Sequence, residues 1–193
     1  MNPHALVQAR QRLARANAAL AELEAATNYD EAEIAWTDFL LAASTIYSKL
    51  EQGAKVSGKS QAWFGRQKKR RRDDHLLRYL HFARNSDEHG IERVTERAEN
   101  NRELFGEPFK FGEHREFRGV SGKDPETGDL IFNEVRGWVS GPGIKLVRAT
   151  DARFGDYCDP PVIGETPPND PLTLGKTALP MIEAIIEEAE GLV

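Results

Sequence analysis

The feature that most constrains this chain is a helical repeat of apolar residues across its first fifty positions. Apolar residues recur there at spacings of three and four, which places them on one side of a helix. Asn2 is a suitable N-cap with Pro3 behind it, whereas Asp30 and Glu33 form a capping box for a second helix that stops at Gly53. The two stripes are Leu6, Ala9, Leu13, Ala16, Leu20 and Leu23, then Trp36, Phe39, Ala43, Ile46 and Leu50. We therefore expect two long helices.

Two further helical stretches follow in the sequence. Ser60 caps a third stretch that continues to Ala83, with the basic residues 66–72 as a point of interruption. A fourth is expected after Asn85 and Ser86, with Ile91, Val94 and Ala98 as its apolar stripe. Four helices joined by short connections predict an up-and-down bundle over residues 1–105.

The second half of the chain, residues 106–193, changes its period. Segments 116–120, 130–139 and 144–149 are rich in β-branched and aromatic residues and are separated by turn sequences, which predicts a small antiparallel β meander. A proline-rich extended connection follows. A last helix is expected from about Thr177, with Pro180 in its first turn, packed on the bundle. The predicted fold class is α+β, mainly α.

Composition excludes several classes of protein. A chain of 193 residues is the size of a single domain with at most a small appendage. Its longest apolar run, residues 39–43, is far shorter than the roughly 20 residues that cross a bilayer, and no export signal is visible. Cys158 is the only cysteine, and no pair of histidines has a metal-ligand spacing. We expect a cytoplasmic protein with no membrane contact, no metal and no cofactor.

Charge is unevenly distributed along the chain. Residues 1–100 hold 16 basic and 14 acidic residues, a net charge of +2, whereas residues 101–193 hold 10 and 17, a net charge of −7. A short segment around residues 66–72 concentrates the positive charge and predicts contact with a polyanion such as RNA. A solvated helix face is the alternative. The candidate nucleic-acid-binding residues are Arg66, Lys68, Lys69, Arg70, Arg71, Arg72 and Arg78.

The segment FARNSDEHG, residues 82–90, holds the strongest candidates for catalysis. Arg84 offers a fork of donors that matches a phosphate, and His89 has a side chain that exchanges protons near neutral pH. Asn85 lies between them and could orient either one. An arginine that holds a phosphate and a histidine that moves protons suffice to cleave RNA, because the 2′-OH supplies the nucleophile.

The run R-N-S-D-E-H, residues 84–89, resembles the R-x4-6-H signature of HEPN domains, in the form whose second residue is Asn, Asp or His. The family consists of helical-bundle proteins, many of them metal-independent endoribonucleases of phage-defence, toxin–antitoxin and RNA-processing systems. The resemblance covers residues 1–105. It implies a homodimer whose two motifs face each other across one cleft, with Arg84, Asn85 and His89 as catalytic residues, RNA as substrate, and a protein antitoxin or regulator as a further partner.

Other interpretations of the same residues stay open. The chain could be a non-catalytic helical protein that uses the same dimer face, or a nucleic-acid-binding module in which residues 66–72 do the binding. Arg84 could neutralise the C-terminal dipole of its helix, and His89 could be a half-exposed residue that bonds Ser86 in a helix cap. Five further residues are expected in the core or at its edge rather than at a site. These are Trp63, Phe64, His75, Tyr79 and His81.

Overall fold

The computed structural model describes the chain except for residues 90–92, 99–108, 124–126, 128–129, 152–154 and 168, and except for the side chains of 88–89, 118–123 and 130–136. Its helices are α1 (Pro3–Ala25), α2 (Tyr29–Ala54), α3 (Gly58–Asp73), α4 (His75–His89) and α5 (Pro171–Glu190). Its strands are β1 (Thr95–Ala98), β2 (His114–Lys123), β3 (Leu130–Ser140), β4 (Gly143–Leu146), β5 (Ala149–Asp151) and β6 (Asp156–Cys158). The predicted α+β class, mainly α, is confirmed.

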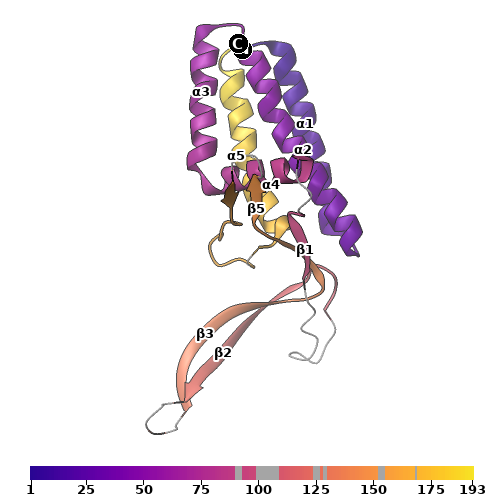
Figure 1. Cartoon of the computed structure of the whole chain (residues 1–193), viewed down its shortest axis with the longest axis vertical. Helices are drawn as coiled ribbons and strands as arrows, with labels where there is room; N and C mark the ends of the chain where they lie inside the picture. Colours follow the sequence, from indigo (N-terminus) through magenta and orange to yellow (C-terminus); the bar gives the residue numbers. More distant parts are fainter. Residues whose placement is uncertain (90–92, 99–108, 124–126, 128–129, 152–154, 168) are drawn as a thin grey trace.

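Helices α1 and α2 form an antiparallel pair, as their periodicity predicts (Figure 1). Asn2 caps α1 by accepting a hydrogen bond from the backbone of His4, and Pro3 opens the helix. The start of α2 differs from the predicted capping box of Asp30 and Glu33, because Asn28 is the N-cap and accepts from the backbone N–H of Glu31 at 3.0 Å. The Asn28 side chain thus already supplies an acceptor for a free backbone N–H at the start of the helix.

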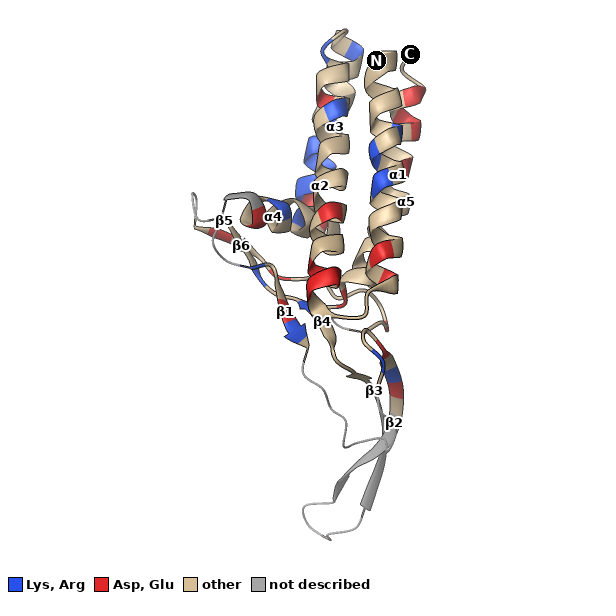
Figure 2. Cartoon of the chain, turned by 90° about the vertical axis from the view of Figure 1, so that its right-hand side faces the viewer, with Lys and Arg blue, Asp and Glu red and all other residues tan. Residues whose placement is uncertain are grey.

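The third predicted helix is two helices. Asp74 separates α3 from α4 by adopting an extended conformation, and its Oδ1 accepts a hydrogen bond from the backbone of Leu77 at 2.9 Å. In Figure 2, α4 lies across the lower part of the bundle, whereas α1, α2, α3 and α5 run along its length. The C-terminal helix α5 therefore completes the bundle by packing on α1 and α2.

The prediction of a fourth helix carrying Ile91, Val94 and Ala98 is wrong for its described residues. Helix α4 continues without a break through Asn85 and Ser86, and Thr95–Ala98 form strand β1 instead. Ile91 lies outside the described residues. Three apolar residues carry a short helical signal, and pairing with β4 overrides it.

Helix α5 begins at Pro171, earlier than predicted. Asp170 is its N-cap and accepts from the backbone of Thr173 at 2.8 Å. Pro180 consequently lies inside the helix rather than in its first turn. It is tolerated because Pro180 lies on the solvent-exposed side of the helix. Water can bond there to the backbone carbonyl that receives no hydrogen bond from the proline nitrogen. Gly175 allows close approach to α1, since a Cβ at that position would lie 2.4 Å from a methyl carbon of Leu20.

The described strands form three antiparallel pairs, β1 with β4, β2 with β3 and β5 with β6. The pairing of segments 116–120 and 130–139 agrees with the predicted meander, but segment 144–149 does not add to that hairpin. It contributes β4, which pairs with β1 so that Thr95 faces Leu146. The β2–β3 hairpin extends away from the helices (Figure 1).

The hydrophobic core joins residues from both halves of the chain. Trp36, Phe39 and Tyr79 are fully buried, and Ile182 and Ile186 from α5 belong to the same cluster. Trp63 and Phe64 are also buried, as predicted. The expected boundary near residue 105 lies outside the described residues.

Candidate functional site

The candidate site is built on one face of α4. Arg78, His81, Asn85 and His89 follow one another at spacings of three, four and four residues, which places their Cα atoms along one stripe of the helix. Arg78 is exposed, and His81 and Asn85 are half-buried. Helix α4 thus places four residues, of three types suited to holding and cleaving a phosphodiester, along one stripe.

Asn85 joins Arg84 to His81. Its Oδ1 accepts a hydrogen bond from Nη1 of Arg84 at 3.2 Å, and its Nδ2 lies 3.5 Å from Nε2 of His81. The Asn85 amide thus orients the guanidinium of Arg84. Of the predicted catalytic residues, the structure brings Arg84 and Asn85 together.

His89 does not occupy the predicted position. It is the last residue of α4 rather than a residue in the first turn of a following helix. The end of α4 at His89 presents carbonyl groups, whereas a helix that began there would have offered free backbone N–H groups to a phosphate. The side chain of His89 lies outside the described part of the chain.

A different side of α4 is anchored to the strands. Tyr79, which is fully buried, donates its hydroxyl to the backbone carbonyl of Val147 at 2.8 Å. The Ser86 hydroxyl donates to the carbonyl of Thr150 and accepts from the Thr150 backbone N–H at 2.9 Å. These contacts fix the rotation of α4 about its axis and so determine which side chains face outward.

The predicted basic run is distributed around α3 (Figure 2). Three of its residues are used within the chain. Lys68 pairs with Glu51, Arg70 with Glu188 at 3.4 Å, and Arg71 stacks on Tyr47. The other candidates of the run are exposed and make no ion pair with the described residues, and Arg78 at the start of α4 shares this property. These free cations are Arg66, Lys69, Arg72 and Arg78.

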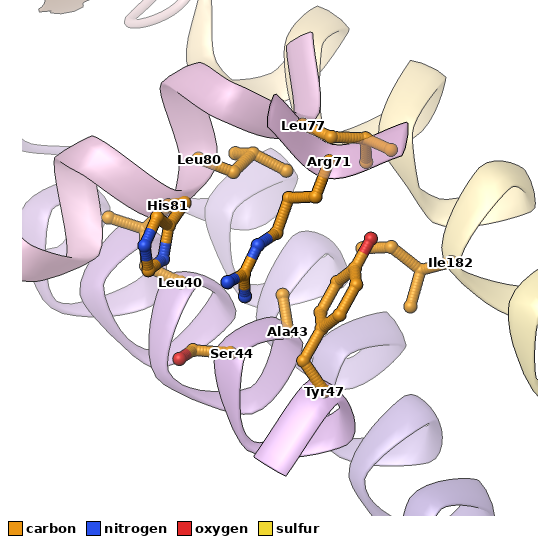
Figure 3. A pocket seen from close by; sticks show the side chains of 9 residues that line it. All are labelled: Leu40, Ala43, Ser44, Tyr47, Arg71, Leu77, Leu80, His81 and Ile182. Atoms are coloured by element: carbon orange, nitrogen blue, oxygen red, sulfur yellow. The ribbon is translucent and has the colours of Figure 1, made fainter. Parts of the chain in front are cut away.

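Arg71 enters a pocket between α2, α3, α4 and α5 (Figure 3). Its Cζ lies 4.9 Å from the centre of the Tyr47 ring. Burial lowers the pKa of Arg71 and raises the pKa of Tyr47 to about 12. Ser44 and His81 also line the pocket. The His81 side chain thus connects this pocket to the Arg84–Asn85 pair.

Sequence reasoning missed three residues of this arrangement. His81 was expected at the edge of the core, yet it lines the pocket and lies beside Asn85. The signal was its spacing of four residues from Asn85, which places both side chains on one helix face. Ser44 and Tyr47 carried no comparable signal, because only the packing of α3 and α4 on α2 brings them to Arg71.

The described part of the chain holds no cluster of three or more His, Cys, Asp or Glu residues suited to a metal ion. Within that same part, no helix has the length and apolar character needed to cross a membrane. Comparisons with models of protein families, with curated proteins and with solved structures give no match for this chain.

Proposed function

We propose that this chain is a HEPN-like RNA-binding protein that cleaves RNA without a metal ion. The observation that carries the proposal is the Asn85 side chain, which bonds Arg84 and lies beside His81 on α4. Arg84 supplies a charge for a phosphate, and imidazole groups move protons at neutral pH. The exposed cations of α3 and Arg78 would attract the RNA backbone.

In the proposed reaction, His89 takes the proton of a ribose 2′-OH, whose oxygen then attacks the adjacent phosphorus. The bond from phosphorus to the 5′-oxygen breaks, and the leaving oxygen takes a proton from a second imidazole, which we assign to His81. Arg84 stabilises the negative charge on the phosphorane oxygens, and Asn85 orients both neighbours. The products are a 2′,3′-cyclic phosphate and a 5′-hydroxyl.

The proposal includes a homodimer. Ile34 and Leu41 of α2 are 66% and 48% exposed, and their spacing of seven residues places them on one face. Ser44, which lines the pocket, lies at the edge of that face. Pairing through α2 would bury both residues and bring two copies of the pocket close together. The same observation supports the second candidate function, a helical interaction protein without catalysis.

Single-stranded RNA incubated with the purified protein in EDTA tests the reaction. We expect products that end in 2′,3′-cyclic phosphate, with no cleavage of DNA of the same sequence. Arg84→Ala and His89→Ala should each lower the rate on the order of 10²-fold. His81→Ala should lower it as well, because it removes the assigned acid.

His75→Ala is the matched control. His75 lies on the same helix, but it is exposed and bonds the carbonyl of Asp159 at 3.1 Å. The control should cleave RNA at the rate of the unchanged protein. Cleavage that requires magnesium, or that survives His89→Ala, contradicts the mechanism. RNA binding that persists without cleavage would leave a nucleic-acid-binding module.

A further inference from the structure

The pocket around Arg71 has the chemistry of an anion site. Its polar lining consists of Arg71, Tyr47, Ser44 and His81, each of which can donate a hydrogen bond, and no carboxylate lines it. Its remaining walls are apolar. In Figure 3 the Arg71 guanidinium reaches from α3 into the space between Tyr47 and His81, toward Ser44 on α2.

Arg71 makes no ion pair with the described residues. Glu51 on α2 attracts the Arg71 charge but forms its ion pair with Lys68. A partly buried cation is costly unless an anion or several hydrogen bonds compensate it. The stacking on Tyr47 supplies only part of this compensation.

Two buried polar atoms in the pocket wall add a second, independent observation. The Tyr47 hydroxyl and the Arg71 Nε have no hydrogen-bond partner among the described residues, although Tyr47 is only 6% exposed. Most buried polar side-chain atoms in proteins are hydrogen-bonded. The unpaired donors therefore point to a group with several acceptor oxygens.

We propose that the Arg71 pocket binds a phosphoryl group. The Arg71 fork matches two phosphate oxygens, and Ser44 and His81 supply donors for the others. The exposed cations Lys69 and Arg72 on the same helix would favour an anion with more than one charge. The group could belong to an RNA chain or to a free phosphate. Binding at this pocket does not depend on the RNA cleavage proposed above.

Thermal unfolding with and without inorganic phosphate, at ionic strength matched with chloride, is the first test. We expect phosphate to raise the unfolding temperature of the unchanged protein. Arg71→Met keeps a long side chain against Tyr47 but removes the charge, so the phosphate effect should disappear. Lys59→Met is the matched control, because it removes an exposed cation from the first turn of the same helix that does not line the pocket, and it should retain the phosphate effect.

Phosphate titration followed by 31P NMR measures the affinity directly. Arg71→Met should weaken binding at least about tenfold, the factor that corresponds to about 1.4 kcal/mol. Ser44→Ala is a second variant that leaves folding intact, because alanine has a high helix propensity and the half-buried Ser44 hydroxyl has no hydrogen bond to the described residues. It should weaken phosphate binding by a smaller factor.

Two further probes distinguish the source of the group. Uridine 5′-monophosphate presents a terminal phosphate, and the dinucleotide UpU presents only a phosphodiester. Tighter binding of the first, lost in Arg71→Met, assigns the pocket to a free or terminal phosphate. Tighter binding of the second assigns it to the RNA backbone. The proposal is overturned if no probe binds at millimolar concentration, if acetate binds as well as phosphate, or if Arg71→Met binds like the unchanged protein.

Discussion

Glu188 of α5 holds the basic helix α3 in place, and its removal gives a quantitative test of the fold. One carboxylate oxygen accepts hydrogen bonds from Nε2 of Gln67 at 2.7 Å and from Nε1 of Trp63 at 3.2 Å. The other accepts from Arg70 at 3.4 Å. Gln67 and Trp63 are only 5% and 4% exposed, so Glu188→Ala leaves two buried donors without their acceptor.

The expected cost follows from these contacts. A buried donor that loses its partner costs about 1–3 kcal/mol, and the low end applies to Trp63 because its bond is the longer of the two. The exposed pair with Arg70 adds at most a few tenths of a kcal/mol. We expect Glu188→Ala to lower the free energy of unfolding by about 2 kcal/mol. For a chain of this size, that lowers the unfolding temperature by about 4–8 °C.

Differential scanning calorimetry of the two alanine variants Glu188→Ala and Glu187→Ala provides the comparison. Glu187 is the adjacent exposed residue of α5, and its side chain makes no ion pair with the described residues. Its replacement should change the unfolding temperature by about 1 °C or less, as for ordinary surface substitutions. Equal unfolding temperatures for the two variants would refute the role of Glu188 in holding α3.

Two other expectations concern the proposed dimer face on α2 and the N-cap of α5. Leu41→Glu should convert the dimer to a monomer in sedimentation equilibrium. Val162→Glu, at an exposed position outside α2, should leave the dimer intact. If the unchanged protein is already monomeric at micromolar concentration, the proposed interface is wrong. Burial alone would raise the pKa of Asp170, but hydrogen bonds from His114 and Thr173 outweigh it and hold the pKa below its usual value. The ionised carboxylate therefore stabilises the fold above about pH 4, and this contribution is lost as the pH falls further. The difference in urea midpoint between the unchanged protein and Asp170→Asn should shrink as the pH falls below about pH 4; a difference that stays the same there contradicts the assignment.

The long helices could be predicted from sequence because their signals are local and repeated. Asn2, Pro3 and the stripe from Leu6 onward all favour the same helix, and the structure confirms α1 with that cap. Asp74 was an equally local signal for the start of α4, since an aspartate three residues before Leu77 is a typical N-cap. The predicted break in the helix was placed at the basic residues 66–72, whereas the structure has it at Asp74.

The strand at residues 95–98 could not be predicted from the sequence of that segment alone. Val94 and Ala98 fit a helical stripe, yet Thr95 also suits a strand, and the outcome depends on β4 nearly fifty residues later. The site shows the same limit. Arg84 and Asn85 are neighbours in sequence, whereas the meeting of Arg71 with Tyr47 requires α3 and α2 to pack at a particular distance.

Helix α4 belongs to the first half of the chain but is held in place by hydrogen bonds to the second half. The residues of the candidate site lie on α4, but Tyr79 and Ser86 of that helix hydrogen-bond to Val147 and Thr150. These partners belong to the second half of the chain. Residues 1–105 alone would lack them, and would leave a buried tyrosine and a buried serine without their acceptors. The orientation of Asn85 and its neighbours is therefore a product of the whole chain, even though every proposed catalytic residue comes from the first half.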